Sequence, residues 1–128
     1  MITFIVPGRP IPYVRMTRRG KYVTDGKHGE RVQAYLNYHA WVAVIAKAAG
    51  VPWLEGELGI AVYTRLKTKR GGGDSSNYRK AIEDALQGIC FKNDKQITFG
   101  VDTVTRGCPQ DEVEIRLWQR VARSDGQI

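Results

Sequence analysis

The stretch Gly72–Ile97, GGDSSNYRKAIEDALQGICFKNDKQI, decides much of the fold. Asp74-Ser75-Ser76 is typical of a helix start, and Gly88 is typical of a helix end. At about 100° per residue, this helix has one polar stripe and one apolar stripe well rotated from it. The polar stripe holds Asn77, Lys80, Asp84 and Gln87, and the apolar stripe holds Tyr78, Ile82, Ala85 and Ile89. We therefore predict a helix that packs one face and presents an amine beside a carboxylate on the other.

Working outward from this helix, the chain alternates between strands and one further helix. Apolar and polar residues alternate over three stretches, as they do in strands: Glu57–Lys67, Ile97–Thr105 and Glu112–Val121. Ile2–Val6 is a β-branched run closed by Pro7-Gly8, which predicts a first strand. Glu30–Ala49 has helical spacing and a glycine stop at Gly50.

The fold class that follows is α/β or α+β, with a small mixed β-sheet and two main helices. At 128 residues the chain has the length of one domain, which we place at 1–122 with a loose tail at 123–128. Between the first strand and the first helix, Arg9–His28 is predicted to be a basic loop, with Tyr22–Thr24 as its one strand-like part.

Composition excludes several classes of protein. The longest apolar run, Trp41–Ala46, is stopped by Lys47 and is far shorter than a membrane span. The N-terminus does not have the pattern of a signal peptide, so we expect a cytoplasmic protein. Cys90 and Cys108 have no metal-ligand spacing, which indicates reduced, structural thiols.

Positive charge is concentrated in two clusters. The formal charge is +7, from 20 Lys and Arg against 13 Asp and Glu. Seven cations lie in Arg9–Arg31 and six lie in Arg65–Lys80. Any single one suits a solvated surface, but together they favour contact with nucleic-acid phosphates. The candidate DNA contacts are Arg15, Arg18, Arg19, Lys21, Lys67, Lys69, Arg70 and Arg79.

Carboxylates accompany these cations. We expect Asp74, Asp84 and Asp94 to converge with Lys80 beside the basic turn, where Mg²⁺ or Mn²⁺ would separate the acids from phosphate and activate water. Each acid also has a plainer interpretation. Asp74 suits a helix N-cap, Asp84 suits an i,i+4 partner of Lys80, and Asp94 suits a turn. His39 is interpreted as helix packing rather than as a ligand.

The central stretch resembles the signature of the RusA-type Holliday junction resolvases, approximately D-x-D-N-L-x-K-x-x-x-D-A-L followed by D-D-x-Q-V. The matching residues are Asp74, Asn77, Lys80, Asp84-Ala85-Leu86, Asp94 and Gln96-Ile97. VPGRPIPYVRMTRRGKYVT near the N-terminus is similar to the opening strand, Pro-Gly turn and arginine-containing loop of that family. The resemblance covers most of the chain.

The resemblance implies a homodimeric, Mg²⁺-dependent endonuclease that binds four-way DNA junctions and resolves them by paired, symmetric nicks. Such enzymes serve recombination and repair and are often carried by prophages. By position, Asp74 and Asp94 would be metal ligands, with Ser76 as a further ligand through its hydroxyl. Lys80 would be the cation near the scissile phosphate, and Asp84 would have either a structural or a catalytic role.

Two departures from the signature leave the function open between classes. Ser76 stands in place of the second acid of D-x-D, and Asn93 stands in place of the first acid of D-D. Either residue could still offer a metal an oxygen, from the hydroxyl or the amide. The first hypothesis is an active resolvase. The alternative is a junction-binding or branched-DNA-binding protein with weak or no nuclease activity, and a basic RNA-binding protein is less favoured.

Overall fold

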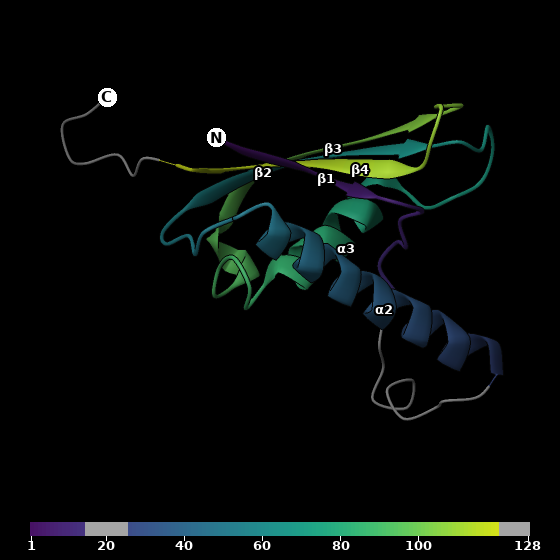
Figure 1. The fold of residues 1–128 in the computed structure, drawn as a ribbon, viewed down its shortest axis with the longest axis horizontal. Coiled ribbons are helices and arrows are strands. Elements are labelled where there is room, and N and C mark those ends of the chain that lie inside the picture. The colour runs from purple at the N-terminus through teal and green to yellow at the C-terminus, as the bar shows by residue number, and fades with distance from the viewer. Residues whose placement is uncertain (15–25, 121–128) are drawn as a thin grey trace.

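The computed structural model describes residues 1–14 and 26–120. In this part of the chain, four strands form one mixed sheet, and two α-helices lie on one side of it (Figure 1). The elements are β1 (Ile2–Pro7), α2 (Gly26–Ala48), β2 (Leu58–Leu66), α3 (Ser75–Leu86), the 3-10 turn η1 (Asp94–Gln96), β3 (Ile97–Arg106) and β4 (Glu112–Gln119). The predicted fold class is confirmed. The strand-like Tyr22–Thr24 and the tail 123–128 lie outside the described residues.

The sheet order is β1-β4-β2-β3. Strand β4 pairs antiparallel with both β1 and β2, whereas β2 and β3 are parallel. Parallel neighbours need a crossover connection, and α3 supplies it by running back from the C-terminal end of β2 to the N-terminal end of β3. A residue that precedes α3 and a residue that follows it therefore lie at opposite ends of the sheet.

The core lies between the sheet and the two helices. On β4 the alternate residues Val113, Ile115 and Leu117 are fully buried, while the residues between them are partly exposed. From α3, Ile82 and Leu86 pack into the same cluster. Burying one such aliphatic side chain stabilises the fold by about 1.5–3 kcal/mol. The apolar residues that recur every second position in β4 and every three to four positions in α3 therefore determine which faces of the sheet and the helix pack together.

Helix α2 is the longest element, with 23 residues. Tyr35, Val42 and Ala46 are fully buried, whereas Leu36 and Val44 on the outer side are exposed. The helix ends at Ala48, just before the predicted glycine stop. Gly50 has a positive φ of 74°, which residues with a side chain rarely adopt. The predicted helix is confirmed and begins four residues earlier than Glu30.

Two sequence-based exclusions can be compared with the structure. Among the described residues, no helix combines the length and apolarity that a membrane span requires. Cys90 is buried and Cys108 is partly exposed, and both are free thiols. Burial raises the pKa of Cys90 to about 11, which keeps its thiol protonated at neutral pH, as expected for a structural cysteine.

Candidate functional site

Asp74 lies at the N-cap position of α3 but does not cap the helix with its side chain. Its backbone is extended, with φ −73° and ψ 151°, and its carboxylate makes no capping hydrogen bond. The backbone carbonyl of Asp74 instead accepts hydrogen bonds from the N–H groups of Asn77 and Tyr78, at 3.0 and 3.2 Å. The side chains of Asp74 and Ser76 are exposed. Both oxygen donors are therefore open to a ligand at the positive end of the helix dipole.

The turn before α3 is folded onto Tyr78. Its hydroxyl accepts a 2.9 Å hydrogen bond from the backbone N–H of Gly73. At Gly72, where φ is +87°, a Cβ would lie 2.9 Å from the same hydroxyl oxygen, so only glycine fits this close approach. Arg106 at the end of β3 donates from Nε to the carbonyl of Gly71 at 2.9 Å. The predicted helix-packing role of Tyr78 thus extends to shaping the turn.

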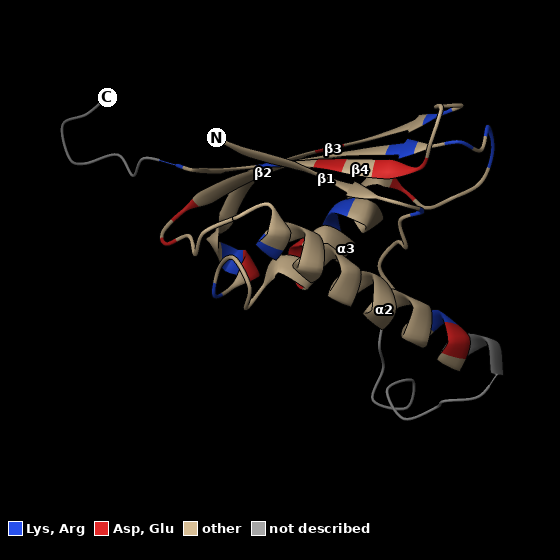
Figure 2. Ribbon diagram, in the orientation of Figure 1, with Lys and Arg blue, Asp and Glu red and all other residues tan. Residues whose placement is uncertain are grey.

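Cations gather on the connection between β2 and α3 and at the neighbouring strand ends (Figure 2). Lys67, Lys69 and Arg70, which were predicted to contact DNA, are all exposed on this connection. The other predicted contacts, Arg15, Arg18, Arg19 and Lys21, lie outside the described residues. One end of α3 therefore carries an acid, a hydroxyl and three exposed cations close together along the chain.

Lys80 and Asp84 lie one helical turn apart, but no ion pair joins them in the described part of the chain. The Lys80 ammonium nitrogen lies 4.1 Å from the ring centroid of Tyr13. The Oδ2 atom of Asp84 accepts a 2.9 Å hydrogen bond from the Tyr35 hydroxyl. Burial, followed by the neighbouring charge of Asp84, raises the pKa of Tyr35, so this hydroxyl keeps its proton. The i,i+4 pairing that the spacing allowed does not form.

Asp94 lies beyond the other end of α3, in a loop held by amide side chains. Its backbone N–H donates to Oε1 of Gln87 at 3.1 Å. Asn93 caps η1, because its Oδ1 accepts from the N–H of Lys95 at 2.9 Å. The amide oxygen that sequence reasoning offered to a metal is thus already used by the backbone, and the side chain of Asp94 is exposed.

The expected convergence of three acids and a lysine within one chain is wrong. α3 has 12 residues, so about 18 Å separates its two ends, with Asp74 at one and Asp94 beyond the other. No group of three or more His, Cys, Asp or Glu residues in ranges 1–14 and 26–120 could hold a metal. The physical reason is the crossover. It places the residue before α3 and the residue after it at opposite ends of parallel strands.

Arg79, another predicted DNA contact, is engaged with acids instead. Its Nη1 lies 3.0 Å from Oδ2 of Asp102 on β3, and its Nε lies 3.2 Å from Oε2 of Glu83. The guanidinium covers Gly100, where a Cβ would come within 2.4 Å of it. Ser75 also donates to Asp102. Burial raises the pKa of Glu83 even though Arg79 opposes the shift. Arg79 is thus held by acids in the described part of the chain, and its assignment to DNA stays a prediction.

Sequence reasoning missed Asp102, because the face of β3 that it occupies follows from the pairing of β3 with β2. In a strand that alternates in and out, Asp102 is level with the core residue Val62 of β2, so it had to face the helices. An acid at such a position predicts a cation on the helix above it.

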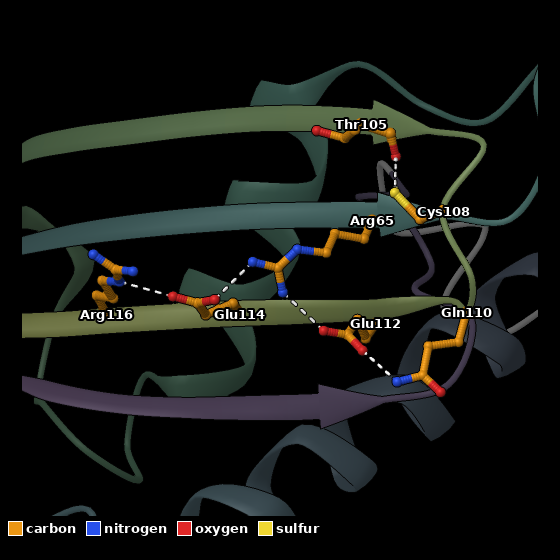
Figure 3. Close-up of polar contacts among 7 residues, drawn as sticks. All are labelled: Arg65, Thr105, Cys108, Gln110, Glu112, Glu114 and Arg116. Atoms are coloured by element: carbon orange, nitrogen blue, oxygen red, sulfur yellow. Dashed lines mark hydrogen bonds and ion pairs between the residues drawn. The ribbon is translucent and has the colours of Figure 1, made fainter.

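Arg65 also belongs to a structural network, on the face of the sheet away from the helices (Figure 3). Its guanidinium lies 2.8 Å from Oε2 of Glu112 and 2.7 Å from Oε1 of Glu114. Arg116 adds a 2.8 Å ion pair to Glu114. Hydrogen bonds from Arg65, then from Arg116, lower the pKa of Glu114. With Arg79, two of the six cations in Arg65–Lys80 are thus paired with acids.

The described residues form a small α+β domain that presents exposed cations and an exposed acid at the entrance of one helix. A family model, Endodeoxyribonuclease RusA, matches residues 7–116 of the chain. The match covers most of the 128 residues, and the chain belongs to the RusA endodeoxyribonuclease family, whose members resolve Holliday junctions. Among curated proteins, no match was found.

Proposed function

We propose that this protein is a divalent-metal-dependent endonuclease that binds four-way DNA junctions and resolves them by paired, symmetric nicks. The observation that carries the proposal is made at the N-terminal end of α3. The exposed carboxylate of Asp74 makes no capping hydrogen bond there, and it follows a turn with three exposed cations. In the described part of the chain, the Asp74 carboxylate serves neither as a cap nor in an ion pair, which leaves its oxygens available to a metal ion. Membership of the RusA family supplies the substrate class.

Metal dependence is proposed from the chemistry of the donors. Asp74, Ser76 and Asp94 offer carboxylate and hydroxyl oxygens, which Mg²⁺ and Mn²⁺ prefer. When bound, such an ion would lower the pKa of a water molecule and offset charge on the phosphodiester. The donors of one chain do not meet, however, because α3 separates Asp74 from Asp94.

This separation supports the proposal of a homodimer. A two-fold axis that brings the start of α3 of one chain to the Asp94 loop of the other would make the same contact twice. Each dimer would then have two equivalent sites, which suits paired nicks in a two-fold symmetric junction. Catalysis would require both copies.

The proposed division of labour among the cations follows from their surroundings. Lys67, Lys69 and Arg70 are exposed and are assigned to DNA phosphates. Arg15, Arg18, Arg19 and Lys21, which lie outside the described residues, are assigned to DNA from their place in the basic cluster of the sequence. Lys80 is assigned to the scissile phosphate. Asp84 is assigned a positioning role, since its carboxylate accepts the Tyr35 hydroxyl proton in a hydrogen bond.

The experiment that tests the proposal is cleavage of a synthetic four-way DNA junction, compared with linear duplex of the same sequence, in Mg²⁺, Mn²⁺ or EDTA. We expect symmetric nicks in the junction that require metal and are lost in Asp74→Asn. Glu57→Gln, an exposed acid elsewhere in the chain, is the matched control and should cleave like the natural sequence. Equal cleavage in EDTA would contradict metal dependence.

A second candidate function is junction binding without useful cleavage. It is favoured by the oxygen of Asn93, which accepts a backbone hydrogen bond, and by the presence of Ser76 in place of an acid. Ser76 and Asn93 both stand in place of acids, so fewer carboxylates are available to a metal, and the Asn93 oxygen already accepts one hydrogen bond. The same assay separates the two functions, because tight junction binding with no product at any metal concentration would select this one.

A further inference from the structure

The segment that follows β1 is anchored on the first turns of α3. The backbone N–H of Tyr13 donates a 3.0 Å hydrogen bond to the carbonyl of Asn77. Pro12 packs against Gly73, where a Cβ would lie 2.8 Å from the Cβ of Pro12. These two contacts fix the Tyr13 side chain beside the helix that carries Lys80. The position of the Tyr13 ring is therefore set by contacts to Gly73, just before α3, and to Asn77 in its first turn.

Lys80 and Asp84 each contact a tyrosine instead of contacting each other. The Lys80 ammonium lies over the Tyr13 ring at 4.1 Å, within the range of a cation–π interaction. The Asp84 carboxylate accepts from the Tyr35 hydroxyl at 2.9 Å. The two rings touch each other edge to face, with centroids 5.9 Å apart and planes at 88°. The tyrosines thus form a bridge that runs from the ammonium to the carboxylate.

The contact with Tyr13 keeps the Lys80 ammonium out of an ion pair with Asp84. A lysine and an aspartate at i,i+4 on one helix face can form an ion pair, which would direct the ammonium toward protein rather than toward a bound anion. Among the described residues, His39 and Glu83 also lie near Asp84: the His39 ring centroid lies 4.2 Å from that of Tyr35, and Glu83 pairs with Arg79. Neither residue competes for Lys80.

We infer that Tyr13 is a positioning residue for Lys80. The Tyr13 ring holds the Lys80 ammonium apart from Asp84, so that the ammonium is available to the phosphate of bound DNA. The inference rests on the proposed function for the role of Lys80. Tyr13 lies in the N-terminal segment, outside the central motif that begins at Asp74, so the inference adds this segment to the site. Tyr35 supports the same arrangement by engaging Asp84.

The test compares Tyr13→Phe, which keeps the ring face, with Tyr13→Leu, which keeps an apolar side chain but removes it. Both variants preserve the backbone N–H that bonds to Asn77. We expect Tyr13→Leu to lower the single-turnover cleavage rate at saturating junction on the order of 3- to 30-fold, from the strength of a cation–π contact. Tyr13→Phe should stay within about twofold of the natural sequence.

A nuclear magnetic resonance measurement tests the contact without relying on activity. The ε-methylene protons of Lys80, assigned by their absence in Lys80→Gln, should be shifted upfield by the Tyr13 ring. The shift should persist in Tyr13→Phe and vanish in Tyr13→Leu. Unshifted Lys80 protons in the natural sequence would overturn the inference.

Junction binding in EDTA then shows whether Tyr13 acts through Lys80. Tyr13→Leu should weaken binding severalfold when Lys80 is present and have no further effect in Lys80→Gln. An equal loss in both backgrounds would mean that Tyr13 acts independently, which overturns the inference. If the natural sequence binds junctions but cuts none in Mg²⁺ or Mn²⁺, the proposed nuclease function fails, while the ring shift and the binding cycle still decide the inference.

Discussion

The two ends of α3 use their polar residues differently. At the N-terminal end, the side chains of Asp74 and Ser76 are exposed, and the Asp74 carboxylate takes no part in capping. At the C-terminal end, Asn93 caps η1, and Oε1 of Gln96 accepts from the N–H groups of Lys92 and Asn93, both at 3.0 Å. Gln96 also donates to the carbonyl of Gly56 at 3.0 Å. The first end is free for chemistry, whereas the second is built to hold a loop.

The difference indicates that mutations at the two ends should separate activity from stability. A side chain that contributes no hydrogen bond to the fold can be exchanged at little cost to folding. A side chain that satisfies several backbone groups cannot, because its removal leaves those groups without partners. Only Asp94, the exposed acid of the C-terminal loop, is expected to act with the first end.

The largest expected effect is loss of cleavage when either Asp74 or Asp94 becomes asparagine, on the order of 100-fold or more, because each would remove a carboxylate ligand. The comparison can be broken by mixing the two variants. In a dimer of one Asp74→Asn chain and one Asp94→Asn chain, a site shared between copies has both defects in one site and none in the other.

Co-expressed and separated mixed dimers should therefore nick one strand of a junction, although neither variant cuts alone. The readout is the ratio of nicked to resolved junctions on a denaturing gel. If each site were formed within one chain, every site of the mixed dimer would carry one defect and no nick would appear.

The next effect is a gain. Ser76→Asp and Asn93→Asp each restore an acid of the family signature, and we expect each to raise the junction cleavage rate in limiting Mg²⁺, on the order of tenfold. An aspartate at position 93 still accepts the hydrogen bond from the N–H of Lys95, so η1 should be preserved. A rate that falls in both variants would mean that this site has adapted to Ser76 and Asn93.

Much of this fold could be predicted from the sequence, because its strands and helices keep one clear period. The alternation of Val113, Ile115 and Leu117 places β4, and the Gly50 stop ends α2. Strand order was beyond prediction, since it depends on which strands pair. That gap also explains the wrong convergence of the acids: without knowing that β2 and β3 are parallel neighbours, Asp94 could not be assigned to an end of the sheet.

Contacts of single side chains were the other limit. Spacing alone pairs Lys80 with Asp84, but the partners that these two side chains contact come from distant segments: Tyr13 for Lys80 and Tyr35 for Asp84. Arg79 likewise matched a basic cluster, and only the register of β3 brings Asp102 beneath it. Pattern predicts which face a residue occupies, whereas packing decides which atom it meets.

A smaller effect, on stability, sharpens the comparison between the two ends of α3. Gln96→Ala should lower the free energy of unfolding by about 1–2 kcal/mol, because two backbone N–H groups lose their acceptor. Asp74→Asn should change it by less than about 0.5 kcal/mol, since no capping bond is lost. Urea unfolding followed by circular dichroism measures both. A larger loss in Asp74→Asn would assign the N-terminal acid a structural role.

The smallest effect concerns Glu83, which lies toward the C-terminal end of α3 and whose pKa is raised by burial and, less strongly, by nearby acids including Asp94. Since the folded pKa exceeds the unfolded one, the ionised form favours unfolding at neutral pH. The penalty disappears as the pH falls through the folded pKa toward the unfolded value. Glu83→Gln, which cannot ionise, should therefore compare more favourably with the natural sequence at pH 7 than at pH 4. Urea unfolding at the two pH values measures this difference. The reverse order would mean that the Arg79 ion pair outweighs burial at this position.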